Sequence, residues 1–317
     1  MASLNSREHL QDEAAAYAWI EAHLWPAGPE CAHCGGTDKI TKLMGKATRF
    51  GLYKCNACRK QFRVTMGTIF EKSHVPLHLW LQAFYMLASG KKGVSSNELH
   101  RVLGVSLKTA WFMSHRIREA MRSGSLMPPM GGAGAVVEVD ETFIGDNKLY
   151  RNFKGNRGYH HKHVVLTLVD RSGEARSFHV DRADAASILP IVRANIDKEA
   201  TIVTDDANYY RPLRADRKHD SVKHARGEWA RGEIHTNTVE GFFSVFKRGM
   251  KGVYQHCDER HLHRYLSEFD FRYSNRVRLG VNDEQRAVRA IKGAAGKRLT
   301  YRRTSQKVTH DDTQTPF

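Results

Sequence analysis

The sequence predicts a mixed α/β domain in its second half, preceded by a small cysteine-rich module and a helical segment. Two observations favour the α/β domain. The runs VEVDE and TIVTDD are typical of buried strands that end in acidic residues, and TNTVEGFFSVFKRG has the apolar spacing of an amphipathic helix. A third observation separates the modules, because the stretch SLMPPMGGAGA at residues 125–135 is rich in Pro and Gly and marks a linker.

The order of elements between residues 136 and 276 predicts the topology of this domain. The segments AVVEVDE, HVVLTLVD and ARSFHV are three consecutive strand candidates, AASILPIVRANI is a helix candidate, and TIVTDD is a fourth strand. A second helix, a fifth strand at SVKHA and a long helix beginning near Thr238 complete the series. This order is the one expected of a ribonuclease H-like fold, a mixed sheet flanked by helices.

Three acidic residues on these elements predict a catalytic metal site. Asp140 and Asp205 end the first and fourth strands and Glu240 lies on the long helix, so we expect their carboxylates to meet at one sheet edge. Magnesium or manganese binds such oxygens, and two ions can activate an attacking oxygen and stabilise a leaving one. Lys247 follows Glu240 by seven residues, on the same helix face. Taken singly, the aspartates could be strand-end turn residues and Glu240 a first-turn acid favoured by the helix dipole.

Both aspartates belong to acidic doublets, Asp140–Glu141 and Asp205–Asp206. Because side chains alternate along a strand, we expect only one member of each pair to face the metal ions. The valines of VEVDE share one face, which leaves Glu138 beside Asp140 as a possible auxiliary carboxylate.

Four cysteines predict a zinc ribbon within residues 29–75. They form two CxxC pairs separated by twenty residues, and four thiolates close a tetrahedral structural site: Cys31, Cys34, Cys55 and Cys58. A redox thiol pair is the competing interpretation, and His33 is expected to point to solvent. Basic residues around the cysteines favour contact with nucleic acid, although zinc ribbons also bind proteins.

Residues 76–124 predict a helix-turn-helix. Ser95 is a candidate cap for the middle helix, and the turn Gly104–Ser106 leads into a last helix. We expect that helix to present a basic face to DNA, formed by Lys108, His115, Arg116 and Arg118. An ordinary three-helix connector is the alternative. Residues 1–28 are expected to form an N-terminal helix.

Charge favours a polyanionic partner. The chain of 317 residues has a formal net charge of +16, and neutralising phosphates with Lys and Arg releases bound counterions. Residues 31–75 carry nine basic and two acidic side chains, a net of +7, and residues 277–310 carry the same numbers. We expect residues 277–317 to be a basic tail, flexible on DNA and disordered at its end. With no signal-peptide pattern and no run of about 20 apolar residues, the protein is expected in the cytoplasm, associated with the bacterial nucleoid and not with a membrane.

Two histidine-rich groups could suggest another metal site: His160, His161 and His163, and the stretch HCDERHLH with His256, Cys257, His261 and His263. We expect none there, because the first group begins a strand and the second caps a helix, and neither closes a ligand set.

The segments VEVDETFIG, VTDDANYY and TNTVEGFFSVFKRG, together with the CxxC–CxxC ribbon, resemble the zinc-ribbon insertion-sequence transposases of the DDE superfamily, the ISXO-two-like group. The similarity runs from about residue 10 to residue 276. By position, the resemblance assigns Asp140, Asp205 and Glu240 as catalytic carboxylates and Lys247 as the basic residue that meets DNA near the scissile phosphate.

The resemblance implies a DNA transposase that cleaves at transposon ends and joins the 3′-hydroxyl to target DNA by metal-dependent transesterification, as a homo-oligomer on double-stranded DNA. Some members of the group are described with an asparagine as third ligand, and Asn237 precedes Glu240 by three residues. We choose Glu240 because a carboxylate binds magnesium more strongly than an amide. A non-catalytic DNA-binding regulator, or a nuclease or resolvase on the same fold, remains the alternative.

Overall fold

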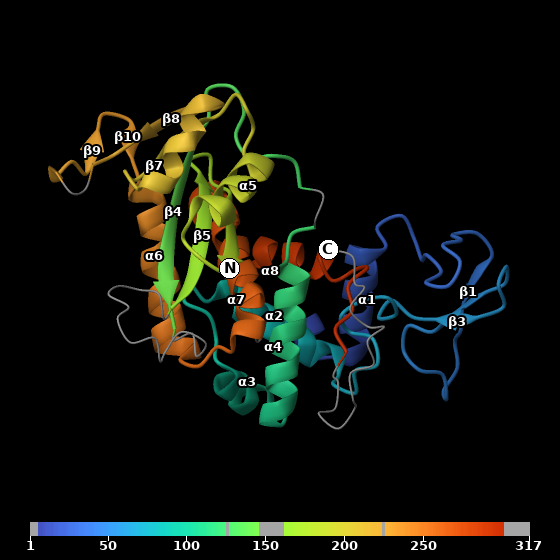
Figure 1. Cartoon of the computed structure of the whole chain (residues 1–317). Helices are drawn as coiled ribbons and strands as arrows, with labels where there is room; N and C mark the ends of the chain where they lie inside the picture. Colours follow the sequence, from blue (N-terminus) through green and yellow to red (C-terminus); the bar gives the residue numbers. More distant parts are fainter. Residues whose placement is uncertain (1–5, 125–126, 146–161, 224–225, 301–317) are drawn as a thin grey trace, which may run out of the picture. The chain divides into compact units, whose positions relative to one another are not determined.

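The computed structural model describes residues 6–124, 127–145, 162–223 and 226–300 (Figure 1). The chain divides into two compact units. The first comprises Met1–Gly90, Val94–Ser125 and Asp283–Phe317, and the second comprises Lys91–Gly93 and Leu126–Asn282. In the part of the chain that is described, no helix combines the length and apolar character needed to cross a membrane.

The first unit begins with a short 3-10 helix η2 (Glu8–Leu10) and the helix α1 (Glu13–Leu24). The side chain of Asp12 caps α1 by accepting a hydrogen bond from the Ala15 amide at 2.7 Å. The ribbon follows as a three-stranded antiparallel sheet in the order β1-β2-β3: β1 (Ile40–Lys42), β2 (Tyr53–Cys55) and β3 (Gln61–Phe62).

Three helices follow the ribbon: α2 (Leu77–Ser89), α3 (Ser96–Leu103) and α4 (Leu107–Met121). Ser95 caps α3 and Ser106 caps α4, each hydroxyl accepting from a backbone amide at 3.1 Å. Gly104 ends α3 in the left-handed conformation with a φ of 66°, which glycine adopts without steric cost. The structure therefore contains the expected pair of helices joined by a short glycine turn.

The prediction that α4 presents a basic face to DNA is wrong for three of the four residues, because these three are buried. His115, Arg116 and Arg118 are 0%, 5% and 1% exposed. The Arg116 guanidinium donates to the carbonyls of Ile69 and Glu71 at 2.6 and 3.0 Å, so it holds the preceding loop instead of facing solvent. Lys108, in the first turn of α4, is exposed. The exposed end of α4 is therefore its N-terminus.

The expected basic tail also contains ordered structure. Residues after 276 form a 3-10 helix η6 (Val277–Leu279) and the helix α8 (Asp283–Lys292). Arg286 is 6% exposed and donates to the Ala88 carbonyl at 3.0 Å, while Ala287, Ala290 and Ile291 are fully buried. Helix α8 is therefore part of the first unit's core and not a flexible arm. Residues 301–317 lie outside the described residues.

The second unit is built on a five-stranded sheet in the order β6-β5-β4-β7-β8. Strands β4 (Val136–Ile144), β5 (His163–Asp170) and β6 (Ala175–Val180) pair antiparallel, and β7 (Thr201–Thr204) and β8 (Lys218–Ser221) add in parallel. This order confirms the ribonuclease H-like fold. The fifth strand lies three residues before the predicted segment, because Lys218–Ser221 is the run that pairs with β7.

Helices cover both faces of this sheet. Helix α5 (Ala185–Asn195) packs on the face that carries Val137 and Val139. Helices α6 (Asn237–Gly249) and α7 (Glu259–Ser274) pack on the face that carries Val165 and Val169. The remaining elements are the 3-10 helix η3 (Asn208–Ala215), the hairpin β9 (Ala230–Arg231) and β10 (Ile234–His235), and the π-helix η5 (Met250–Tyr254).

Candidate active site

Strand register brings Asp140 and Asp205 together. Strands β4 and β7 run in parallel with Val136 opposite Thr201 and Glu138 opposite Val203. If this register is extended by two residues beyond the last pair, Asp140 lies beside Asp205. Strand β7 stops at Thr204, whereas β4 continues to Ile144 because it still pairs with β5. Asp140 therefore lies mid-strand and not at a strand end as predicted, but at the level where its neighbouring strand ends.

Asp140, Glu141 and Asp205 form an acidic cluster. One carboxylate oxygen from each lies within 4.8 Å of the others. The expectation that only one residue of the Asp140–Glu141 doublet faces the metal site is therefore wrong, because both carboxylates belong to the cluster. Because β7 pairs with β4 only as far as Glu138, the edge beside the doublet is open, which lets the longer Glu141 side chain approach the aspartates. Asp206 is exposed and does not belong to the cluster.

Two tyrosines of η3 hold Glu141. Tyr209 and Tyr210 each donate a hydroxyl hydrogen bond to its carboxylate, the second at 2.8 Å. Tyr210 is fully buried, so this contact fixes the carboxylate from the core side. Burial, followed by the nearby Glu141 charge, raises the pKa of both tyrosines, which keeps them protonated as donors.

The surroundings of the cluster raise the pKa of two of its carboxyl groups, those of Asp140 and Glu141. Burial, together with the charges of Glu141, Asp205 and Glu240, raises the pKa of Asp140 from 3.8 to about 8. The Glu141 backbone amide opposes it by donating to Asp140 at 2.8 Å. Burial also raises the pKa of Glu141. Several carboxylates that repel one another in a half-buried site form a donor set that suits a hard divalent cation with oxygen ligands.

Helix α6 carries Glu240 and Lys247. The predicted apolar stripe is buried, which orients the helix: Val239, Phe242, Phe243, Phe246 and Met250. Glu240 is exposed, and its carboxylate accepts from the Thr236 hydroxyl at 2.9 Å. It acts on the pKa of Asp140 through its charge, but it does not join the 4.8 Å cluster. Lys247 is exposed near the other end of the helix.

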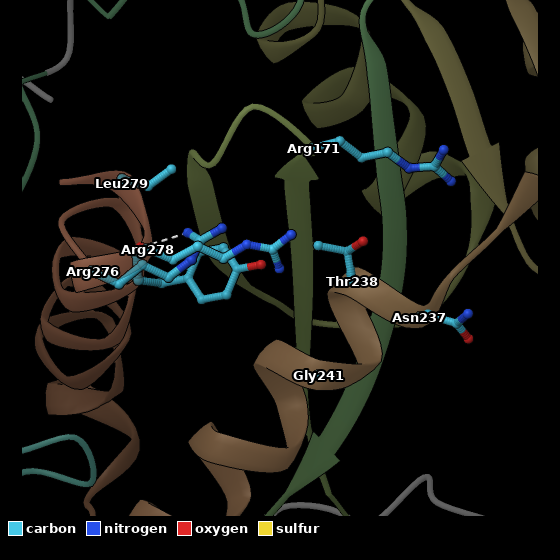
Figure 2. A pocket seen from close by; sticks show the side chains of 8 residues that line it. Arg171, Asn237, Thr238, Gly241, Arg276, Arg278 and Leu279 are labelled. Atoms are coloured by element: carbon cyan, nitrogen blue, oxygen red, sulfur yellow. Dashed lines mark hydrogen bonds between the residues drawn. The ribbon is translucent and has the colours of Figure 1, made fainter. Parts of the chain in front are cut away.

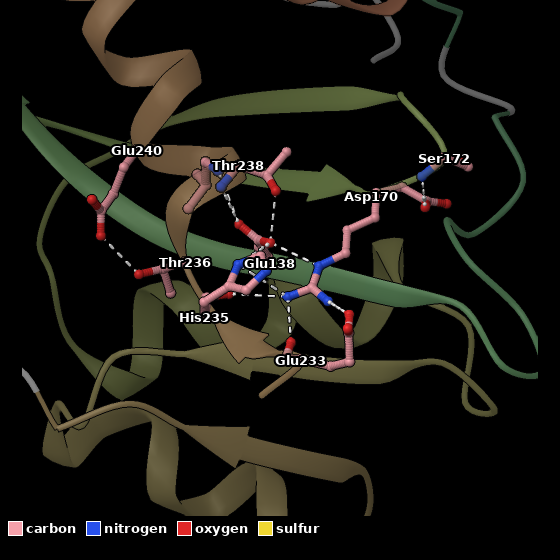
Figure 3. Close-up of polar contacts among 10 residues, drawn as sticks. Glu138, Asp170, Ser172, Glu233, His235, Thr236, Thr238 and Glu240 are labelled. Atoms are coloured by element: carbon pink, nitrogen blue, oxygen red, sulfur yellow. Dashed lines mark hydrogen bonds and ion pairs between the residues drawn. The ribbon is translucent and has the colours of Figure 1, made fainter. Parts of the chain in front are cut away.

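Glu138 is bound to α6 and is not an auxiliary metal ligand (Figure 3). It is 0% exposed. Its carboxylate accepts from the backbone amides of Thr238 and Val239 at 2.8 and 3.0 Å, and from the Thr238 hydroxyl at 2.8 Å. Arg171 forms an ion pair with Glu138 Oε1 at 2.9 Å, and His235 Nδ1 lies 3.3 Å from the same oxygen. These donors occupy both oxygens, so Glu138 fixes the first turn of α6 against β4.

A cationic pocket opens beside this turn (Figure 2). Its volume is about 530 Å³. Arg276 and Arg278 extend from the segment after α7 toward the start of α6. The Cζ atom of the Arg276 guanidinium lies 4.0 Å from the ring centroid of Tyr273. Gly241 leaves one wall open, because a Cβ atom there would meet nothing within 4 Å. The lining residues are Arg171, Asn237, Thr238, Gly241, Tyr273, Arg276, Arg278 and Leu279.

The four ribbon cysteines converge as predicted. The Sγ atoms of Cys31 and Cys58 lie 3.7 Å apart, as do those of Cys34 and Cys55, and all four lie within 4.8 Å of one another. Thiolates about 2.3 Å from a tetrahedral zinc ion are separated by about 3.8 Å, whereas a disulfide would require about 2.05 Å. The donor set therefore fits structural zinc. His33 is exposed and its Nε2 lies 3.1 Å from the Gln61 carbonyl.

Comparison with known proteins agrees with this arrangement. Residues 131–274 match the ISXO2-like transposase domain, and residues 11–61 match the transposase zinc-ribbon domain. The chain therefore carries an ISXO2-like transposase domain behind a transposase zinc ribbon. Both matches lie where the sequence resemblance placed them, and the first contains all members of the acidic cluster together with Glu240 and Lys247.

Two further proteins resemble this chain. A protein of Halobacterium salinarum, described as an uncharacterized protein in transposable element ISH50, is 27% identical over 263 residues, covering 78% of this chain and 86% of its own length. A chain of the simian T-cell lymphotropic virus intasome, solved by cryo-EM in complex with PP2A regulatory subunit B56 gamma, is 14% identical. The match covers 54% of this chain and 63% of that chain with a TM-score of 0.27, a likeness too low to support a structural argument.

Proposed function

We propose that this chain is a DNA transposase that cleaves at the ends of an insertion element and joins the freed 3′-hydroxyl to target DNA. The observation that carries the proposal is the convergence of Asp140, Glu141 and Asp205 within 4.8 Å. The match of residues 131–274 to the ISXO2-like transposase domain supports it, because DDE transposases act by phosphoryl transfer.

In this proposal the carboxylates hold the catalytic cations. Asp140 and Asp205 would hold the ions at the sheet edge, and Glu240 on α6 would be the third ligand, with Asn237 as its neighbour on the same turn. When bound, a pair of Mg²⁺ or Mn²⁺ ions supplies activation of the attacking oxygen and stabilisation of the leaving oxygen. Glu141 adds negative charge to the site, held in place by Tyr209 and Tyr210.

The DNA backbone is the proposed partner of the basic residues around α6. Lys247 is exposed on the same helix as Glu240 and would steady a phosphate near the scissile bond. The pocket with Arg276 and Arg278 lies beside the first turn of α6, where the two guanidinium groups favour an anion. Because an element has two ends, we propose that more than one copy of the chain assembles on DNA.

A strand-transfer assay tests the proposal. The full chain is incubated with labelled DNA that carries the ends of its own element, magnesium and a plasmid target. Wild-type protein is expected to give cleaved and joined products. Asp140→Ala and Glu240→Ala are expected to abolish both while retaining binding to the ends. Asp206→Ala is the matched control, because this exposed carboxylate neighbours Asp205 outside the cluster, and it is expected to keep activity.

The same assay separates the alternatives. Cleaved but unjoined products would favour a nuclease or resolvase on this fold. Sequence-specific binding without strand breakage by the wild-type protein would favour a DNA-binding regulator. Cleavage by the Asp140→Ala variant would refute the assignment of the metal site.

A further inference from the structure

Two adjacent strands place histidines on the sheet face that α7 covers. His179 on β6 lies opposite Val165 on β5. His163 precedes Val165 by two residues on the same strand, so both imidazoles project from one face. Val165 packs in the cluster formed with α6 and α7, which identifies that face. Glu259 is the first residue of α7 and brings a carboxylate to the same place.

The three side chains have the spacing of a metal ligand set. His163 Nδ1 lies 3.8 Å from Glu259 Oε1, and His179 Nε2 lies 4.0 Å from the same oxygen. One donor atom from each residue lies within 4.8 Å of the others. Zinc binds imidazole nitrogen and carboxylate oxygen at about 2.0–2.2 Å, so donors around a tetrahedral ion are about 3.4 Å apart. A small movement of the partly exposed Glu259 side chain closes the difference.

The imidazole of His163 gives an independent indication of a binding site. The residue is 9% exposed, and within the described residues its Nδ1 has no hydrogen-bond partner. The 3.8 Å to Glu259 is too long for a hydrogen bond, so this buried nitrogen points at a carboxylate without bonding it. Burial lowers the pKa of His179, which favours the neutral imidazole that metals bind.

We propose that His163, His179 and Glu259 form a zinc site on the catalytic domain, additional to the ribbon site. Two imidazoles and one carboxylate leave a fourth position for water, and the 45% exposure of the Glu259 side chain leaves that side open. The ion would join the first turn of α7 to β5 and β6. His163 lies opposite Ile144 whereas Asp140 lies opposite Thr167, a separation of four residues on β5, or roughly 13 Å at 3.3 Å per residue.

The two histidine-rich sequence groups contribute to this site only in combination. His163 comes from the first group and Glu259 from the HCDERHLH stretch, while His179 belongs to neither. The sequence predicts no further metal site because neither group closes a ligand set alone, and the strand pairing that brings His179 beside this strand is not apparent from the sequence. His160 and His161 lie outside the described residues.

Zinc content of the full chain tests the proposal. Protein saturated with zinc and then dialysed is analysed by mass spectrometry for zinc per chain, and its melting temperature is measured with and without added zinc. We expect two zinc ions in wild-type protein and one in Glu259→Gln and His179→Gln. Glu199→Gln and His256→Ala change exposed residues of the same unit and are expected to retain two.

Each outcome decides the question. One zinc per wild-type chain with a zinc-dependent increase in melting temperature that both ligand variants lose supports a weaker site with the same ligands. One zinc per wild-type chain without that increase overturns the proposal. Two zinc ions in both ligand variants would overturn it equally.

Discussion

The buried carboxylate of Glu138 accepts a hydrogen bond from the backbone amide of Thr238 at 2.8 Å, which ties the first turn of α6 to the central strand of the catalytic sheet. Helix α6 carries Glu240 two residues later. The position of the proposed third ligand therefore depends on a carboxylate that is not itself a ligand.

Replacing Glu138 by Gln is expected to destabilise the catalytic unit. The substitution removes the negative charge that pairs with Arg171. It also replaces one of the two carboxylate oxygens, which accept from Arg171, the Thr238 hydroxyl and the amides of Thr238 and Val239, by an amide group that cannot accept. Hydrogen bonds to a buried charge each contribute about 1.5–3 kcal/mol, so we expect a loss of roughly 2–3 kcal/mol. Chemical unfolding of both proteins measures the change.

Glu233→Gln is the matched control for that substitution. Glu233 also pairs with Arg171, at 3.3 Å, but its side chain is 95% exposed. An exposed pair contributes at most about 1 kcal/mol. Equal destabilisation by the two substitutions would contradict the anchoring role of Glu138.

The raised pKa of Asp140 predicts an unusual pH dependence of stability. This carboxyl has a pKa of about 8 in the folded chain and 3.8 in the reference state. The folded state therefore binds its proton more tightly, so without magnesium stability falls as pH rises from about 4 to 8, by at most roughly 1.4 kcal/mol per pH unit. Asp140→Asn should remove this decline. Thermal unfolding at pH 5 and pH 8 measures it, and an identical pH dependence in both proteins would contradict the assignment.

Cys34→Ser is expected to lower zinc content by one ion per chain and to unfold the ribbon, because a module this small depends on its metal. Cys257→Ser is the control, since Cys257 lies outside the four-cysteine cluster. Metal analysis and circular dichroism provide the readouts. Unchanged zinc content in Cys34→Ser would show that the cysteines do not hold the ion.

Arg278→Ala is expected to weaken DNA binding at every sequence and to reduce the slope of log affinity against log salt by about 1, as loss of one phosphate contact does. Lys198→Ala is the control, because Lys198 is exposed and precedes β7, at the strand end opposite to Asp205. Fluorescence anisotropy over a salt series measures both slopes. An unchanged slope for Arg278→Ala would remove the pocket from the DNA interface.

Much of the fold could be predicted from the sequence because its signals are local. The CxxC pairs specify the ribbon, Ser95 caps the helix that it precedes, and the β-branched runs give the strand order. The pairing of Asp140 with Asp205 follows from that order, since adjacent parallel strands bring their equivalent positions together.

The missed features depend on side-chain partners distant in sequence. Arg116 has the charge of a DNA-contacting residue, but the carbonyls that bury it belong to residues 69 and 71. Strand alternation predicts that Glu141 faces away from the site, but it does not predict how far a side chain reaches beyond the end of a neighbouring strand. The two tyrosines after Asp205 are the sequence signal that could have identified it, because their hydroxyls require an acceptor.

Binding of Mn²⁺ to zinc-saturated protein, followed by electron paramagnetic resonance, tests most directly whether Asp140 and Asp205 share a cation. We expect wild-type protein and Asp206→Asn to bind Mn²⁺ with similar affinity, and Asp140→Asn and Asp205→Asn each to lose at least tenfold in affinity, equivalent to about 1.4 kcal/mol. Wild-type affinity in both Asp140→Asn and Asp205→Asn would contradict it.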